Sequence, residues 1–241
     1  MTRLGLCALP LAAGLAPAQA MAAPTTPTPV IPVPGNARAE GPARPAAPAK
    51  AMVISGNARF TVLTPEMIRI EYSPKGAFED RATFAIQNRD LGEVPHFTTS
   101  EDKDFLYIST DKLKLKYRKG TDPLTSPASP DNLTIDMKVN GKNVRWYPGK
   151  PDPQNLKGTT RTLDRNDGDS YRNILENGLV SRSGWAVIND SWSNERPDGS
   201  HSFALEPSDE VGFDWWTPRA DKDALDLYFM GYGHDYKKAM G

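Results

Sequence analysis

Cysteine, histidine and long apolar runs are scarce in this sequence, and each scarcity removes a class of function. The only cysteine among the 241 residues is Cys7, so the chain beyond it offers no disulfide and no cysteine metal site. The three histidines (His96, His201 and His234) are scattered and show no ligand-pair spacing. Beyond the first twenty residues no apolar run approaches the roughly 20 residues of a membrane span. We therefore expect no metal and no membrane partner.

An excess of charge of either sign is also missing. The chain has 29 basic and 30 acidic residues, and the basic residues form no block. Proteins that bind nucleic acid or anionic membranes normally carry a basic patch, so neither partner is expected. Ser181 and Ser183 do not lie in a G-x-S-x-G motif, and the "GYG" of 231–233 lacks the spacing of a phosphate-binding loop. The sequence thus predicts no cofactor, and "GYG" is interpreted as a strand-to-helix turn.

Residues 1–20 have the pattern of an export signal. Arg3 precedes an apolar run from Leu4 to Ala16, and Ala18-Gln19-Ala20 matches the small-x-small site of a signal peptidase. The mature protein is therefore expected to be exported, to the periplasm or the extracellular space.

Residues 21–50 consist mostly of Ala, Pro and Thr, with almost no large side chains to bury. Proline fixes φ and removes a backbone donor, which favours an extended, disordered linker. We expect the folded domain to cover residues 51–233. Residues 234–241 ("HDYKKAMG") read as the start of a short helix, with an acidic residue followed by lysines.

Between these ends the apolar residues alternate with polar ones. In residues 59–74 ("RFTVLTPEMIRIEYSP") the alternation is interrupted by Thr64-Pro65-Glu66, which indicates a hairpin. Residues 133–139 ("LTIDMKV") place four apolar side chains on one face, and Asn140-Gly141 is a favoured two-residue hairpin turn. Further strand candidates are Phe105 to Thr110, Lys112 to Arg118, Phe84 to Asn88, Gly184 to Ile188, Phe203 to Leu205 and Leu225 to Met230. The fold class is predicted to be all-β.

One strand candidate has a basic face. Lys112, Lys114, Lys116 and Arg118 alternate with apolar residues. This face could bind a polyanion, or it could be a solvated sheet face whose lysines discourage edge-to-edge aggregation. We favour the solvated face because nothing elsewhere extends the basic patch.

Aromatic residues and carboxylates concentrate in the second half of the chain. Aromatic rings can stack on sugars while Asp, Asn and Arg bind hydroxyls, but most Trp and Tyr residues fill cores. Most of the carboxylates lie beside Gly, Asn or Pro, where turn formation is the simpler explanation. They are Asp164, Asp167, Asp169, Glu176, Asp190, Glu195 and Asp198.

Three segments together resemble glycoside hydrolase family 31, the α-glucosidase and α-xylosidase family. They are "NLKGTTRTLD" (155–164), "LENGLVSRSGWAVINDS" (175–191) and "DLYFMGYGHDYKKAMG" (226–241). The chain looks like the N-terminal region of that family, which implies a galactose-mutarotase-like β-sandwich (supersandwich). The expected architecture is this sandwich with a disordered N-terminal region and a short C-terminal helix start.

The resemblance implies that the catalytic aspartates lie elsewhere. Family members carry them on a (β/α)₈ barrel that follows the "GYGHDYKKA" helix, so this chain is expected to lack both and to be inactive alone. Its expected partners are that barrel, in the same polypeptide, and an α-linked oligosaccharide bound by the full-length enzyme. The parent would be a secreted retaining α-glycosidase that hydrolyses O-glycosyl bonds.

The resemblance also implies two substrate-binding residues, and no catalytic ones, in this chain. In similar enzymes a loop of the sandwich supplies a carboxylate to the sugar, and the matching position is Asp190. The family pattern has two aspartates before the serine, whereas this sequence has Asn189 in the first place. The amide keeps hydrogen-bonding capacity but removes a charge, so Asp190 is the stronger candidate.

Two alternatives remain open at this point. The chain could be a free-standing carbohydrate-binding module on a Pro/Ala linker, or a structural extracellular β-sandwich. Sugar binding would favour the module over an accessory domain, and neither sugar binding nor a downstream barrel is expected for the structural sandwich.

Overall fold

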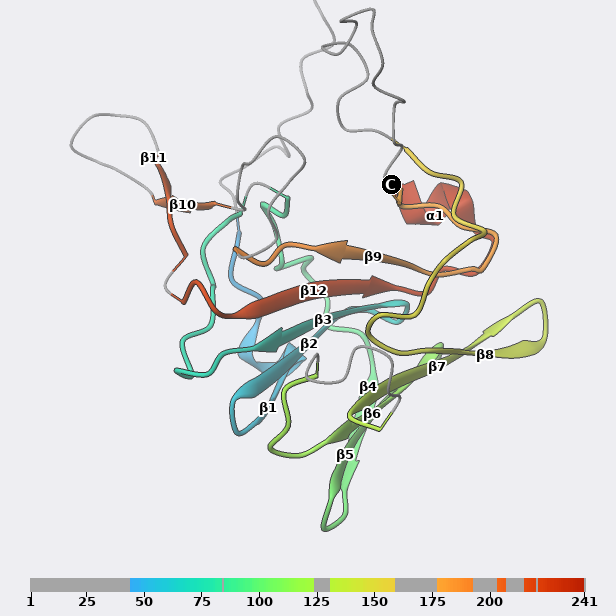
Figure 1. Ribbon diagram of the computed structural model, residues 1–241, viewed down its shortest axis with the longest axis horizontal. Coiled ribbons are helices and arrows are strands. Elements are labelled where there is room, and N and C mark those ends of the chain that lie inside the picture. The colour runs from blue at the N-terminus through green and yellow to red at the C-terminus, as the bar shows by residue number, and fades with distance from the viewer. Residues whose placement is uncertain are drawn as a thin grey trace, which may run out of the picture. The chain divides into compact units, whose positions relative to one another are not determined.

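The computed structural model describes residues 44–83, 85–123, 131–158, 177–192, 203–206, 215–219 and 221–240 (Figure 1). The expected export signal and most of the expected linker lie outside these ranges. The described fold begins at residue 44, ahead of the expected start at 51. Ala47 is buried there, and the backbone N–H of Arg89 donates to the carbonyl of Arg44 at 2.9 Å.

Two five-stranded antiparallel sheets form the body of the protein. Sheet I has the order β1-β2-β3-β12-β9, and sheet II has the order β4-β5-β6-β7-β8 (Figure 1). The strands of sheet I are β1 (Met52–Ser55), β2 (Ala58–Thr64), β3 (Met67–Tyr72), β12 (Leu225–Met230) and β9 (Ala186–Asn189). Those of sheet II are β4 (Phe97–Glu101), β5 (Phe105–Thr110), β6 (Leu113–Arg118), β7 (Leu133–Val139) and β8 (Lys142–Trp146).

Three smaller elements complete the described fold. A short ribbon pairs β10 (Ala204–Glu206) with β11 (Trp215–Thr217), and Thr83 forms a bridge to Ala204. The 3-10 turn η1 (Ala49–Ala51) precedes β1, and helix α1 (Tyr236–Met240) follows β12. The predicted all-β sandwich is confirmed. Among the described residues, no helix is long and apolar enough to cross a membrane.

The core lies between the two sheets, where the apolar residues of each strand meet. Phe60 of β2 packs against Tyr117 of β6 with ring centroids 5.0 Å apart, and Phe229 of β12 packs against Trp146 of β8 at 4.9 Å. These side chains belong to one apolar cluster shared by both sheets. Alternation therefore directs one face of each strand into this core.

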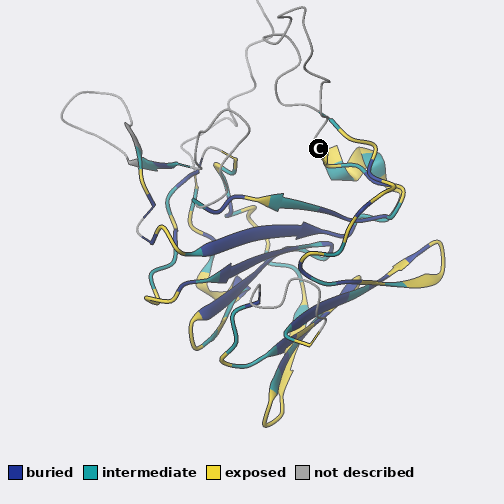
Figure 2. Ribbon diagram, in the orientation of Figure 1, coloured by how far each residue is buried: buried dark blue, intermediate teal, exposed yellow. Residues whose placement is uncertain are grey.

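The central strands of sheet I, β2, β3 and β12, are buried on both faces. In Figure 2 dark blue runs along β2, β3 and β12, whereas the hairpin tips of sheet II are yellow. On the face away from sheet II, here called the outer face, Ala47, Leu63 and Tyr228 form a small apolar cluster. Arg69 and Asp226, also on this face, are 1% exposed.

Glycines set the turns that the sequence indicated. Asn140 and Gly141 have φ of 50° and 76°, which is the two-residue hairpin turn predicted between β7 and β8. Gly184 has φ of 80°, and a Cβ there would lie 2.6 Å from Cγ2 of Val139 and 3.1 Å from Cα of Gly233. Residue 184 must therefore be a glycine, because its φ is positive and a side chain there would collide with Val139 and Gly233. The "GYG" segment is the predicted turn between β12 and α1.

Some sequence predictions were incomplete or wrong. Residues 85–88 form no strand, and Phe84 lies outside the described residues. Strands β1, β4 and β11 were not predicted. Strand β6 is central in sheet II, so its lysines do not protect a sheet edge. Lys114 and Lys116 are nevertheless exposed, as a solvated face requires.

Candidate functional site

The outer face of sheet I carries a buried ion-pair network centred on Arg69. Its guanidinium donates to both carboxylate oxygens of Asp226, at 2.8 and 2.7 Å, and lies 3.0 Å from the carboxylate of Glu71. It also donates to the carbonyl of Glu79 at 2.8 Å. Strand alternation explains the arrangement, since β3 and β12 pair in register and their polar side chains share the outer face.

Arg59 extends the network along β2. It donates to the two oxygens of Glu71 at 2.7 and 2.9 Å and to Asp80 at 2.7 Å. Its guanidinium also lies 4.6 Å from the ring centroid of Phe78. Segment 77–80 is therefore held over the sheet by charge-assisted hydrogen bonds and a cation–π contact.

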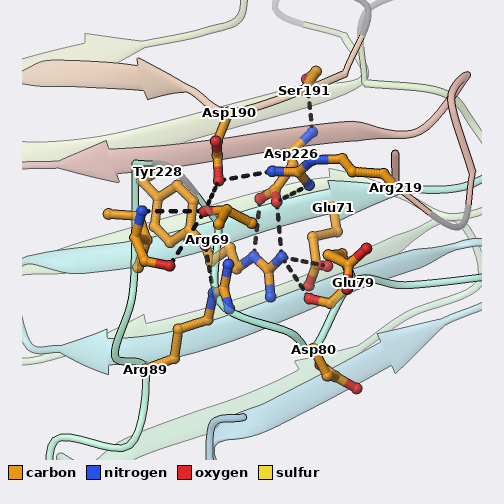
Figure 3. Close-up of polar contacts among 12 residues, drawn as sticks. Arg69, Glu71, Glu79, Asp80, Arg89, Asp190, Ser191, Arg219, Asp226 and Tyr228 are labelled. Carbon is orange, nitrogen blue, oxygen red and sulfur yellow. Dashed lines mark hydrogen bonds and ion pairs between the residues drawn. The ribbon is translucent and has the colours of Figure 1, made fainter. Parts of the chain in front are cut away.

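Asp190, the stronger sequence candidate, is a member of this network. Its side chain is fully buried, accepts a 2.5 Å hydrogen bond from the Thr83 hydroxyl, and lies 2.7 Å from the Arg219 guanidinium. Arg219 in turn donates to Asp226 at 2.6 Å. Figure 3 shows the guanidinium of Arg219 reaching toward both Asp190 and Asp226.

Ser191 continues the connection to β12. Its hydroxyl accepts a 2.9 Å hydrogen bond from the backbone N–H of Asp226, and the backbone N–H of Asp190 donates to the Asp226 carbonyl at 2.8 Å. The "NDS" sequence thus joins the end of β9 to the start of β12. Both Asp190 and Ser191 face the protein interior.

Burial and the neighbouring guanidiniums shift the pKa values of the network carboxylates in opposite directions. Burial alone would raise the pKa of Asp226, but the charges of Arg69 and Arg219 outweigh it and hold this pKa well below its ordinary value. For Glu71, burial raises the pKa, and the guanidiniums of Arg69 and Arg59 counteract that rise. Burial also raises the pKa of Tyr228, whose phenol oxygen accepts a 2.6 Å hydrogen bond from Arg89.

The space beside the network is too small for a substrate. The cavity lined by Glu71, Glu79, Arg219 and Asp226 has about 10 Å³, which is about the room of one water molecule. The ion pairs therefore bind the covering segments to the sheet. They present no acid or base to a ligand in this arrangement.

Asn189, the weaker sequence candidate, lies on a different surface. It is exposed at the end of β9 and lines a pocket of about 220 Å³, here called the edge pocket. The pocket is shared with residues of the β8 end, the segment after it, and β12. Among them are Trp146, Asp152, Asn155, Asn177, Trp185 and Leu227. Asn189 and the next residue, Asp190, thus point to opposite sides of sheet I, because successive side chains of an extended chain alternate between its faces.

The wall of the edge pocket is fixed by polar groups. The carboxylate of Asp152 accepts hydrogen bonds from the hydroxyls of Ser181 and Ser183, at 3.0 and 2.7 Å. The Asn155 side chain accepts from the backbone N–H of Gly178 at 2.8 Å and donates to its carbonyl at 3.1 Å. These contacts join segments 152–157 and 177–183 into one rigid wall.

A larger groove lies at the end of the sandwich beside α1. It has about 570 Å³ and is lined by residues of sheet II, by Glu66 in the turn between β2 and β3, by the segment that follows β12, and by α1. Lys238 of α1 lies 2.7 Å from the Glu66 carboxylate, and Lys114 and Asp136 face each other across β6 and β7. Cations and carboxylates alternate around this groove, which is unlike the single-sign surface of a polyanion site.

The described residues contain no group of three or more His, Cys, Asp or Glu side chains placed to hold a metal ion. Several sequence carboxylates lie outside the described residues, namely Asp164, Asp167, Asp169, Glu176, Glu195 and Asp198.

The described parts of the three resembling segments, 155–158, 177–191 and 226–240, lie next to one another. Asn155 forms a bridge with Ser181, and β9 pairs with β12 along four residues. The backbone N–H of Gly233 donates to the Gly184 carbonyl at 2.9 Å, and Nε2 of His234 donates to the Arg182 carbonyl at 2.8 Å. Segments separated by up to eighty residues therefore form one continuous region around the edge pocket.

Comparison with known proteins gives few matches. No protein-family model and no curated protein matches the chain. Two solved structures of a GH31 dextranase from Flavobacterium johnsoniae are similar to it. One is a mutant complexed with isomaltotriose (16% identity, TM-score 0.40), and the other is complexed with glucose (15% identity, TM-score 0.39). Each match covers 83% of this chain but only 28% of the dextranase chain.

Proposed function

We propose that this chain is the N-terminal accessory β-sandwich of a secreted retaining α-glycosidase of glycoside hydrolase family 31. The observation that carries the proposal is the convergence of the three resembling segments in one region of an all-β sandwich. Motifs that are separate in the sequence but contiguous in space are expected of a shared functional surface.

In this proposal the catalytic carboxylates lie on a barrel of the same polypeptide, and the sandwich packs against that barrel. The parent enzyme hydrolyses O-glycosyl bonds of α-linked oligosaccharides through a covalent glycosyl-enzyme intermediate. The sandwich lends the end of β9 to the sugar site. Asn189, which is exposed, contacts the sugar, and buried Asp190 holds the strand end in position through Arg219 and Thr83.

The source DNA beyond the Gly241 codon tests this proposal directly. We expect it to encode a (β/α)₈ barrel with carboxylates at the ends of its strands. The joined polypeptide should hydrolyse 4-nitrophenyl α-glucoside or α-xyloside, and the present chain alone should not. A stop codon with no barrel behind it would overturn the proposal.

A free-standing carbohydrate-binding module is the second candidate, and the edge pocket is the observation that favours it. Calorimetry of the chain with malto- and xylo-oligosaccharides, together with the downstream sequence, separates the candidates. Sugar binding without a barrel indicates a module. A barrel, with or without sugar binding by the sandwich itself, indicates the accessory domain.

A further inference from the structure

The edge pocket lies where the sandwich is open at its side. Strands β8 and β9 are the last strands of their sheets among the described residues. Trp146 ends β8, Trp185 immediately precedes β9, and their ring centroids are 6.4 Å apart. Both rings are buried, and only a small part of each reaches the pocket. The pocket therefore has an apolar floor made from the margin of the core.

The rim of the pocket is polar and accessible. Asn177 and Asn189 are exposed, and Lys150 is partly exposed. The amide oxygen of Asn177 accepts from the Lys157 ammonium at 2.5 Å, which directs the hydrogen-bond donors of its –NH₂ group elsewhere. An amide-rich rim over an apolar floor suits a ligand that has both hydroxyls and C–H faces.

The backbone of β9 adds hydrogen-bonding groups. The N–H of Asp190 donates to β12, so residues 186 and 188 also direct their backbone groups to β12 in the antiparallel alternation. Val187, between them, directs its N–H and C=O away from β12, toward the side of β9 that has no neighbouring strand among the described residues. Val187 is also one of the residues that line the pocket.

The charge and size of the pocket restrict the ligand. Lys150 and Asp152 are the charged residues of its lining, and their charges cancel. Asp152 is occupied by Ser181 and Ser183, so it shapes the wall. The 220 Å³ volume lies below the roughly 300–1,000 Å³ of pockets for drug-sized ligands. A neutral ligand about the size of one ring fits these properties.

We propose that the edge pocket is a carbohydrate-binding site of the sandwich itself and that it holds one pyranose unit of a neutral α-linked oligosaccharide. The sugar's C–H face lies on the floor formed by Trp146, Trp185 and Leu227. Its hydroxyls bind the amides of Asn177 and Asn189. This inference rests on the proposed function for the sugar class, but the pocket is formed by residues of this chain.

The test is titration calorimetry of the full chain with maltotriose and with xylotriose. We expect a dissociation constant in the micromolar to low-millimolar range for at least one of them. Asn177→Ala and Asn189→Ala should each weaken binding about tenfold, the effect of losing one good hydrogen bond. Both residues are exposed, and circular dichroism and the melting temperature verify that each variant folds.

Asn143→Ala is the matched control, since Asn143 is an exposed asparagine that lines the larger groove beside α1. It should leave binding unchanged. Loss of binding in Asn143→Ala with retention in the two pocket variants would move the site to that groove and overturn the proposal. Absence of binding to both sugars would also overturn it.

The failure of this inference can be distinguished from the failure of the proposed function. If a barrel follows Gly241 and the sandwich binds neither sugar, the pocket inference alone is wrong. If no barrel follows and the pocket variants lose sugar binding, the accessory-domain proposal is wrong and the pocket inference stands.

Discussion

The two faces of the central strands of sheet I, β2, β3 and β12, are both buried but are built from opposite chemistry. The inner face contributes Phe60, Ile70 and Phe229 to the apolar core, and the outer face contributes Arg69 and Asp226 to the ion-pair network. Apolar contacts are non-directional and tolerate repacking, whereas a buried ion pair needs both partners in position. The same strands therefore have an apolar face on which substitutions lower stability in proportion to the buried area lost. On their other face, removal of a single ion-pair partner has a large effect.

Removing the centre of the network should have the largest effect. Arg69→Met leaves Asp226 and Glu71 buried without their shared cation, and we expect a loss of about 3–5 kcal/mol in the free energy of unfolding. Urea denaturation measures this loss. The control is Arg145→Met, because the Arg145–Asp136 pair is exposed and should contribute less than about 1 kcal/mol. Equal losses in the two variants would contradict the claim that the buried ion pairs of Arg69 stabilise the fold more than an exposed ion pair does.

The inner face should respond somewhat less. Ile70 is fully buried and neighbours Arg69 in β3, and Ile70→Ala should cost about 3 kcal/mol through lost apolar burial and the resulting cavity. The same denaturation measurement applies. Ile54→Ala, at a residue that is 63% exposed, should change stability very little. A larger loss in Ile70→Ala than in Arg69→Met would reverse the order of the two faces.

The neighbours at the end of β9 provide a closer comparison. Asp190→Asn keeps the side-chain shape but removes the charge facing Arg219, and we expect a loss of about 2 kcal/mol. Asn189→Asp is the reciprocal exchange at an exposed residue and should stay within about 0.5 kcal/mol. Thermal unfolding of both variants measures the difference. Similar losses would show that Asp190 does not hold the strand through its charge.

Acid should weaken the outer face selectively. The folded-state pKa of Asp226 is lowered from its ordinary value of 3.8. Its contribution is therefore complete above pH 3.8 and is lost as pH falls toward the folded-state pKa. Glu71, whose pKa is raised, has the opposite sign and loses stability as pH rises from about 4.5 through its folded-state pKa. Stability measured between pH 2 and 5 should fall steeply with acid in the wild type and less steeply in Asp226→Asn.

The solvated face of sheet II should respond least. Lys114→Ala removes an exposed side chain and should change the free energy of unfolding by less than about 0.5 kcal/mol. Leu115→Ala, at the adjacent buried residue, should cost several-fold more. Comparable losses would mean that the lysine face supports the fold.

The sequence predicted the strands whose signals are local. Alternation placed the β2–β3 hairpin and β5, β6 and β7, and Asn140-Gly141 placed the turn to β8. Strand β4 has the sequence "FTTSE", with a single apolar residue at a sheet edge, and this pattern gave no alternation to detect. The residues around Phe84 are apolar yet form no strand in the described part.

The ion-pair network could not be predicted because its covering is non-local. In "MIRIEY", Arg69 and Glu71 alternate with isoleucines as on a half-solvated sheet. They are buried beneath segment 77–83 and Arg219, which contact Arg69 and its partner Asp226 from positions outside β3, so no local pattern indicates the burial. The resemblance pointed to the end of β9 and favoured Asp190 because it carries a charge. In the structure Asp190 is buried, with its charge paired to Arg219, whereas Asn189 lines a pocket. Whether either residue contacts sugar stays a prediction.

The place of β12 within sheet I also constrains the order in which the protein can assemble. Sheet II is a meander in which each strand pairs with its neighbours in the sequence between residues 97 and 146, so its pairings join positions much closer in the chain than β3 and β12. Strand β3, in contrast, must wait for β12, and Arg69 finds Asp226 across a separation of 157 residues. We therefore expect the meander to form first, with the β3 edge unpaired in the meantime and open to wrong partners. Pulse-labelling hydrogen exchange would reveal this as early protection of β5 to β7 and late protection of β12 and of the β3 amides that bond to it. Simultaneous protection would show that the two sheets form together.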